Sequence, residues 1–162
     1  ATLAKRIDSL TAEALVLTKE YADDWLPSAH EFLIQGQEAA ARGWTNKAAF
    51  ELHQAAERLY HGVLLVLTLY SPHSHRLSLL RAMAEQLDER LIDVWPRESR
   101  SDRAHFEKLK DAYVKARYSK HYTISAEELE WLGARVEALG QIVGAVCAER
   151  IATLEKAARE AG

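Results

Sequence analysis

Residues Arg117 to Tyr122 place a permanent cation, a titratable imidazole and two aromatic rings in one short segment, Arg-Tyr-Ser-Lys-His-Tyr. Arginine and lysine bind phosphate oxygens by charge-assisted hydrogen bonds, and aromatic rings stack on nucleobases. No acidic residue lies between Asp111 and Glu127 to neutralise these cations. The segment therefore predicts a site for a nucleotide or an RNA phosphate, formed by Lys115, Arg117, Lys120, His121 and Tyr122.

Arg117 and His121 could also cleave RNA without a metal ion. The imidazole would move a proton to or from the ribose 2′-hydroxyl or the leaving oxygen, while the guanidinium would stabilise the phosphorane charge. A structural alternative is that Arg117 pairs with a carboxylate such as Glu57, and that His121 forms a hydrogen bond within the turn. Because aromatic residues at helical spacing more often belong to a core, we expect Tyr113 and Tyr118 to pack inward.

A second polar group comprises His53, Glu57 and His61, which recur every four residues and share one helix face. Their span of about 12 Å along the helix axis allows at most two of them to bind one metal ion. We therefore interpret Glu57 as an anchor for a cation from a neighbouring helix, with His53 in a supporting role at the edge of the core. We expect no metal site and no cofactor.

Composition limits the class of protein. The 162 residues are 48% hydrophobic and 28% charged, with only seven glycines and three prolines, which indicates one all-α domain. A formal net charge of -3 excludes a generally basic nucleic-acid coat. The most apolar run, Leu59 to Tyr70, is well short of the roughly 20 residues that span a membrane. With one cysteine, Cys147, and no signal-peptide pattern, we expect a cytoplasmic protein that does not contact the membrane.

Apolar spacing and breaker residues divide the chain into helices. A first helix, Thr2 to about Asp24, carries Leu3, Ile7, Leu10, Ala14 and Leu17 at intervals of three and four. The remaining expected helices are Pro27–Gly43, Lys47–Tyr70, one from Ser74 or His75 to Leu87, Ser99–Tyr118, and a last helix that starts at a capping box of Ser125 and Glu128. We therefore expect an extra N-terminal or linker helix over 1–24, a helical-bundle domain over 25–155, and a frayed tail over 156–162.

Two stretches, His53-Gln-Ala-Ala-Glu-Arg-Leu-Tyr60 and Ala116-Arg-Tyr-Ser-Lys-His-Tyr122, strongly resemble the HEPN domain family. The likeness extends from about Trp25 to Ile151 and includes Trp25-Leu-Pro-Ser-Ala29 and Leu91-Ile-Asp-Val-Trp-Pro96. It is greatest to the C-terminal half of bacterial proteins that fuse a nucleotidyltransferase domain to a HEPN domain. The resemblance implies an up-and-down bundle of four or five helices, usually a homodimer, with the Arg/His region near a cleft at the dimer interface.

The resemblance leaves three functions open. HEPN proteins include non-catalytic members that bind nucleotides and metal-independent ribonucleases, which are often toxins paired with a nucleotidyltransferase antitoxin. The ribonuclease pattern usually has a longer gap than the three residues between Arg117 and His121. We therefore expect first a dimeric nucleotide- or RNA-binding module that works with a nucleotidyltransferase domain in the same or a neighbouring chain. The alternatives are a ribonuclease that uses Arg117 and His121, and a purely structural dimerisation module.

Overall fold

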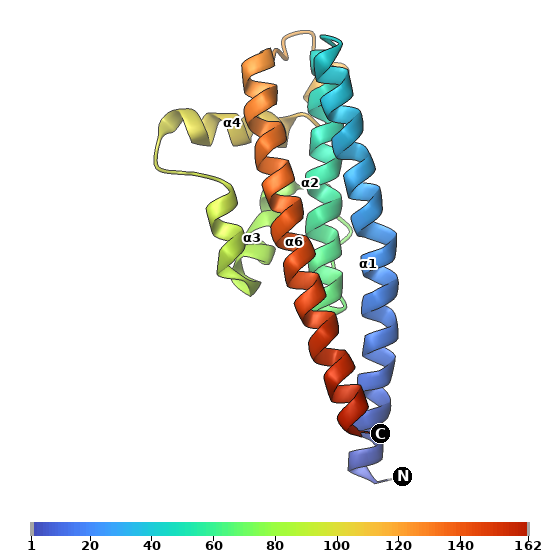
Figure 1. Ribbon diagram of the computed structural model, residues 1–162. Coiled ribbons are helices and arrows are strands. Elements are labelled where there is room, and N and C mark those ends of the chain that lie inside the picture. Colours follow the sequence, from blue (N-terminus) through green and yellow to red (C-terminus); the bar gives the residue numbers. More distant parts are fainter. Residues whose placement is uncertain (1, 162) are drawn as a thin grey trace.

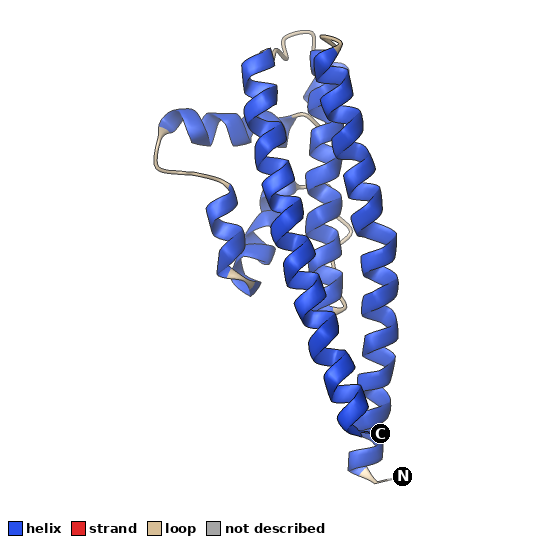
Figure 2. Cartoon of the chain, viewed as in Figure 1, coloured by secondary structure: helices blue, strands red, loops and turns tan. Residues whose placement is uncertain are grey.

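The protein is an elongated bundle of helices (Figures 1 and 2). The computed structural model describes residues 2–161, and within that range it contains helices and connecting loops but no strand. In chain order the elements are α1 (Leu3–Ala41), α2 (Thr45–Thr68), α3 (Leu77–Leu87), the 3-10 helix η1 (Glu89–Val94), α4 (Arg100–Asp111), α5 (Lys115–Tyr118) and α6 (Ala126–Ala161). The predicted all-α class and the bundle architecture are confirmed.

Helix α2 is the centre of the bundle, as its apolar composition predicted. It packs against both α1 and α6, which also contact each other, and α3, α4 and α5 contact it as well, while η1 packs on α3 and α6 (Figure 1). Its small residues let the neighbouring helices approach closely: a Cβ on Gly62 would lie 3.2 Å from Cβ of Trp25. Trp95, at the end of η1, fixes this arrangement, because its buried Nε1–H donates a 2.7 Å hydrogen bond to the hydroxyl of Tyr60 on α2.

The two helices expected before Gly43 are one continuous helix, α1, with Pro27 inside it. Proline removes one backbone donor and usually bends or ends a helix. Here Pro27 is exposed, whereas Leu26 and Ala29 on either side pack into the core. Tertiary packing on both sides therefore outweighs the lost hydrogen bond. The predicted glycine cap is confirmed, since Gly43 adopts the left-handed conformation with φ of 79°.

The predicted single helix Ser99–Tyr118 is broken. Ser99 caps α4 by accepting a hydrogen bond from the N–H of Asp102, but α4 ends at Asp111. A turn over 112–114 separates it from the short helix α5. Figure 1 shows α4 projecting away from the long helices, so the chain must turn after α4 for α5 to contact α2. This break decides where Arg117 lies.

Helices α1 and α6 extend beyond the end of α2 and form a two-helix stalk, which we define as residues 3–21 and 147–161 (Figure 1). An ion pair of 3.8 Å between Lys19 and Glu155 joins its two helices. The capping box predicted at the other end of α6 is confirmed, with reciprocal hydrogen bonds of 3.1 Å between Ser125 and Glu128. Across residues 2–161, no helix is long and apolar enough to cross a membrane.

Candidate phosphate-binding site

Arg117, on α5, is held by three aromatic rings. Its guanidinium carbon lies 4.7 Å from the ring centroids of Phe50 and Tyr113, and 4.9 Å from that of Tyr118. Its Nε donates a 2.8 Å hydrogen bond to the backbone oxygen of Tyr113. Cation–π contacts of this kind contribute about 0.5–1 kcal/mol each at exposed sites. The rings therefore hold the guanidinium in place without neutralising its charge.

The two Nη groups of Arg117 have no protein partner within residues 2–161, and no carboxylate there lies within ion-pair distance of them. The residue is exposed. An arginine offers its fork of donors to a phosphate or a carboxylate in two parallel hydrogen bonds. The Nε–H hydrogen bond and the three ring contacts thus orient Arg117. Its Nη donors remain available to an anion from solution.

Glu57 is not the partner of Arg117 that the sequence indicated. Its buried carboxylate accepts a 2.6 Å hydrogen bond from Nδ1 of His75, in the loop before α3. The ring of His75 in turn stacks on Tyr113, with centroids 4.6 Å apart and planes inclined by 14°. Glu57 therefore acts on the site through two intermediaries: it orients His75, and His75 supports the Tyr113 ring over which Arg117 lies.

His53 is fully buried beneath this layer. Its ring centroid is 5.4 Å from that of Tyr113, its Nδ1 faces the side-chain oxygen of Gln54 at 3.3 Å, and its Nε2 has no partner. Burial is the main reason that the pKa of His53 falls to about 4; the Gln54 contact opposes this shift, and the nearby His75 and Arg117 side chains add to it. His53 is therefore a neutral support for Tyr113 and takes no part in contacting a ligand.

His61, the third member of the α2 set, has a structural role. Its Nε2 donates to the backbone oxygen of Ser74 at 3.0 Å and its Nδ1 contacts the hydroxyl of Ser71. These bonds fix the loop that follows α2. Within the described part of the chain, no group of three or more histidine, cysteine or acidic side chains is placed to hold a metal ion.

His121 lies in different surroundings from Arg117. It is exposed in the turn before α6 and lines a shallow depression of about 330 Å³ together with residues of α4, the first residue of α5 and residues of the turn. The depression is formed by Lys108, Asp111, Lys115, Ser119, His121, Tyr122 and Thr123. Arg117 is not among these residues and faces α2 instead. Within one chain, Arg117 and His121, the two candidate catalytic residues, therefore contact separate sets of neighbours.

Three further residues of the predicted site differ in whether their side chains have partners within the described residues. Lys115 pairs with Asp111 at 3.1 Å, one helical turn earlier, so its charge is partly neutralised. Tyr122 packs against the core and donates a 2.8 Å hydrogen bond to the backbone oxygen of Lys108; burial raises the pKa of its hydroxyl. Lys120 is exposed, and no hydrogen bond or ion pair of its side chain occurs within residues 2–161.

The expectation that Tyr118 packs inward is wrong. Its side chain is 74% exposed, although its ring lies beside the Arg117 guanidinium. Tyr118 is thus the aromatic face available for stacking on a base, while Tyr122 is held at the core. Sequence reasoning also missed Phe50 as a neighbour of Arg117 and His75 as a neighbour of Tyr113. Phe50 lies three residues before His53, so the shared helix face was a usable signal, whereas His75 depends on the path of a loop.

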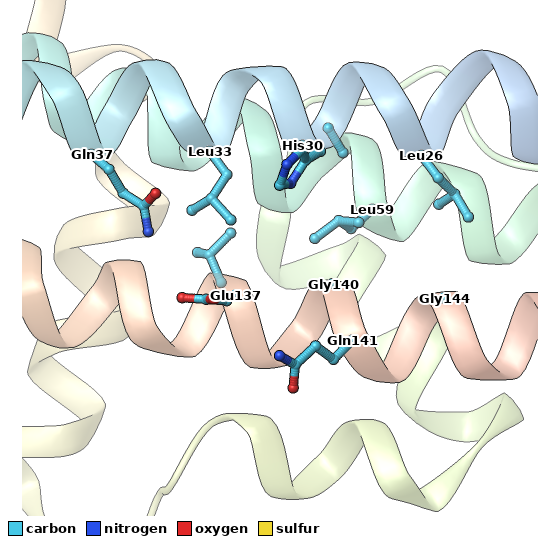
Figure 3. Close-up of a pocket in the computed structure, with 11 residues that line it drawn as sticks. Leu26, His30, Leu33, Gln37, Leu59, Glu137, Gly140, Gln141 and Gly144 are labelled. Atoms are coloured by element: carbon cyan, nitrogen blue, oxygen red, sulfur yellow. The ribbon is translucent and has the colours of Figure 1, made fainter.

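A separate groove between α1, α2 and α6 does not have the chemistry of a phosphate site. It encloses about 330 Å³ and is lined mainly by apolar side chains such as Leu26, Leu33 and Leu59 (Figure 3). His30, Gln37, Glu137 and Gln141 are its polar residues, and no lysine or arginine lines it. A carboxylate with no cation beside it repels an anionic ligand. The cationic surface around α5 remains the candidate site.

Comparison with known families agrees with the resemblance that the His53–Tyr60 and Ala116–Tyr122 stretches carry. These two stretches meet around Tyr113. The family model of the HEPN domain matches residues 22–146. The chain belongs to the HEPN family. That match includes α2 with its His53–Tyr60 stretch and the whole Arg117–Tyr122 segment, and it leaves the whole stalk outside. The chain has no match among the curated proteins. The HEPN fold supports a helical module whose function is related to nucleotides or RNA.

Proposed function

We propose that this HEPN domain binds a nucleotide or an RNA phosphate at Arg117. The observation that carries the proposal is an exposed guanidinium whose two Nη groups have no protein partner within residues 2–161. A buried or paired arginine would have to break a contact to bind an anion, whereas this one has nothing to exchange except water. Because the rings already fix its position, less conformational entropy is lost on binding.

Three neighbours extend the proposed site. Tyr118 offers an exposed ring for a base, and Lys120 offers a second, mobile donor for a phosphate. His121 borders the adjoining depression and could reach a longer ligand that passes over the turn. Lys115 and Tyr122 contribute less in this arrangement, because the first is paired with Asp111 and the second is hydrogen-bonded to Lys108.

The proposal includes two partners. A nucleotidyltransferase domain, in the same or a neighbouring chain, would supply the reaction in which the bound nucleotide takes part. A second copy of the chain would complete a homodimer. Both follow from the likeness of the His53–Tyr60 and Ala116–Tyr122 stretches to fused HEPN domains, and the Arg117 site does not depend on either of them for its geometry.

Binding is measured by the anisotropy of a fluorescein-labelled single-stranded oligoadenylate. We expect Arg117→Ala to weaken binding about 10- to 100-fold, since a charge-assisted hydrogen bond contributes about 1.5–3 kcal/mol. Arg159→Ala is the matched control, because Arg159 is an exposed arginine at the far end of α6. Equal losses in the two variants, or no binding by the unaltered chain, would overturn the proposed site.

The same samples separate binding from cleavage. Arg117 and His121 contact different neighbours, so we expect the RNA to stay intact in EDTA when it is examined on a denaturing gel. Cleavage by the unaltered chain that is lost in both Arg117→Ala and His121→Ala would favour the ribonuclease function instead. Absence of oligoadenylate binding at every protein concentration, with an intact oligomer, would favour the purely structural module.

A further inference from the structure

The stalk carries an apolar seam that the rest of residues 2–161 leaves largely uncovered. Residues 2–10 of the chain are all exposed, and Leu3, Ile7, Leu10 and Leu17 have exposed fractions of 73%, 52%, 62% and 38%. With Ala14 and Tyr21, which are half-buried, they recur at alternating intervals of four and three residues. That spacing places them in one row along about 27 Å of helix, as in the contact seam of a coiled coil.

The position of the seam shows why it is uncovered. Trp25, one helical turn after Tyr21, contacts α2: its ring centroid is 5.3 Å from that of His61. Helix α2 ends at Thr68, so the same face of α1 continues beyond α2 without a neighbour. Helix α6 packs on an adjacent face through Thr18, which is buried, and through the Lys19–Glu155 ion pair. The seam thus lies where a further helix would continue the line of α2.

The seam also lies outside the part of the chain that the HEPN family model matches, residues 22–146. The domain fold therefore does not account for four large apolar side chains in water at this end. An exposed row of this kind is typical of a surface that meets another helix.

We propose that the seam pairs with the seam of a second copy of this chain, with the two α1 helices antiparallel. The flanking charges favour this occupant. Arg6 and Glu13 are seven residues apart on the same flank of the seam. In an antiparallel pair, Arg6 lies opposite the partner's Glu13 and Glu13 lies opposite the partner's Arg6, so a two-fold axis forms both ion pairs at once.

A parallel pair lacks this complementarity. It would place Arg6 opposite the partner's Thr11 and Glu13 opposite the partner's Thr18, two uncharged residues. The second of these, Thr18, is already buried against α6. The antiparallel pair of α1 helices therefore places both charged residues opposite a partner of opposite sign. It also brings the two stalks together as four helices around the apolar row.

This inference names a contact between two copies that is separate from the proposed homodimer, whose interface would lie near the Arg/His region, and it is independent of the phosphate site. The test is the molar mass of the full chain, measured by light scattering after size-exclusion chromatography over a range of concentrations. The mass of one chain is 18.3 kDa. We expect Leu10→Glu to halve the mass of the assembly, because it places two carboxylates in the seam.

Val16→Glu is the matched control. Val16 is 56% exposed on the same helix, but it lies about 100° around the axis from Leu17 and outside the seam. We expect this variant to keep the full mass. Because both positions are exposed, circular dichroism should show unchanged helix content in each. An assembly whose mass is the same in Leu10→Glu as in the unaltered chain overturns the inference, as does a chain that is monomeric at all concentrations because another segment covers the seam.

Charge reversal tests the direction of the pairing. Arg6→Glu should weaken association about tenfold, and the double variant Arg6→Glu/Glu13→Arg should restore it, since both ion pairs re-form with exchanged partners. Failure of the double variant to recover would overturn the antiparallel arrangement. Oligoadenylate binding per chain at Arg117 should stay unchanged in Leu10→Glu, so failure of the stalk contact and failure of the phosphate site give different results.

Discussion

Helix α2 and the segment that carries Arg117, residues 112–123, contain the two stretches that identify the family, and they have opposite physical characters. Most residues of α2 from Leu52 to Val66 are buried, and Glu57 and His61, although polar, are satisfied by hydrogen bonds. In the segment, Ala112 is the buried residue and the cations are exposed. The contrast is therefore between a helix that is mostly core and a segment that places exposed cations on the surface.

Tyr113 is the point at which the two regions meet. Its ring contacts Phe50 and His53 of α2 and His75 of the loop, and it also contacts the Arg117 guanidinium. A rigid helix therefore fixes the position of an exposed cation through one aromatic ring. Polar residues of α2 that looked like possible ligands in the sequence are better explained as the support of that ring.

The largest expected difference between the two regions is in stability. Leu52→Ala removes a side chain that is 1% exposed and leaves a cavity next to Gly36, so the free energy of unfolding should fall by about 2–5 kcal/mol. Val114→Ala removes part of a side chain that is 56% exposed and should change it by less than about 0.5 kcal/mol. Urea unfolding monitored by circular dichroism measures both, and equal losses would show that residues 112–123 belong to the core as much as α2 does.

The same contrast separates what the sequence predicted from what it did not. Local signals predicted the start of α6 at Ser125 and the left-handed turn at Gly43, because each depends on a few adjacent residues. The central position of α2 followed from its apolar composition. These features need no knowledge of how distant segments pack.

The errors concern features that tertiary contacts decide. Continuity of α1 through Pro27 depends on packing of Leu26 and Ala29 against the rest of the bundle. The partner of Glu57 is eighteen residues away, in a loop whose path brings His75 onto Tyr113. Exposure of Tyr118 follows from the break after α4, which no glycine or proline marks. Of the candidate site, the residue types were predictable, and the neighbours that orient Arg117 were not.

A smaller expected effect is the dependence of the unfolding free energy on pH, to which the buried histidines of α2 contribute. Burial keeps the pKa of His53 near 4 in the folded chain, against about 6.5 when it is unfolded, so the unfolded state binds the extra proton as the pH falls below 6.5. This should remove about 2 kcal/mol of stability between pH 7 and pH 5. Burial also lowers the pKa of His61, which acts in the same direction.

His53→Gln is the informative variant, because it removes the proton site while keeping a polar side chain. Its unfolding free energy should change less between pH 7 and pH 5 than that of the unaltered chain, and His121→Gln serves as the control for loss of an exposed histidine. Urea titrations at the two pH values provide the measurement. If His53→Gln did not alter the dependence of the unfolding free energy on pH, the folded chain would hold a protonated His53 at pH 5. The buried helix would then not be a neutral support beneath a charged surface.

The smallest expected effect is at the junction between the segment and α6. Ser125→Ala removes the side-chain acceptor for the N–H of Glu128 and should lower the free energy of unfolding by about 1 kcal/mol. Ser99→Ala, at the start of α4, is the matched control for an N-cap, with a similar cost expected because Ser99 accepts one hydrogen bond from Asp102. Neither change should alter oligoadenylate binding more than about twofold, since the rings of Phe50 and Tyr113 hold Arg117 independently of either cap. If Ser125→Ala lowered that affinity in proportion to stability while Ser99→Ala did not, the position of Arg117 would depend on the start of α6 more than on α2.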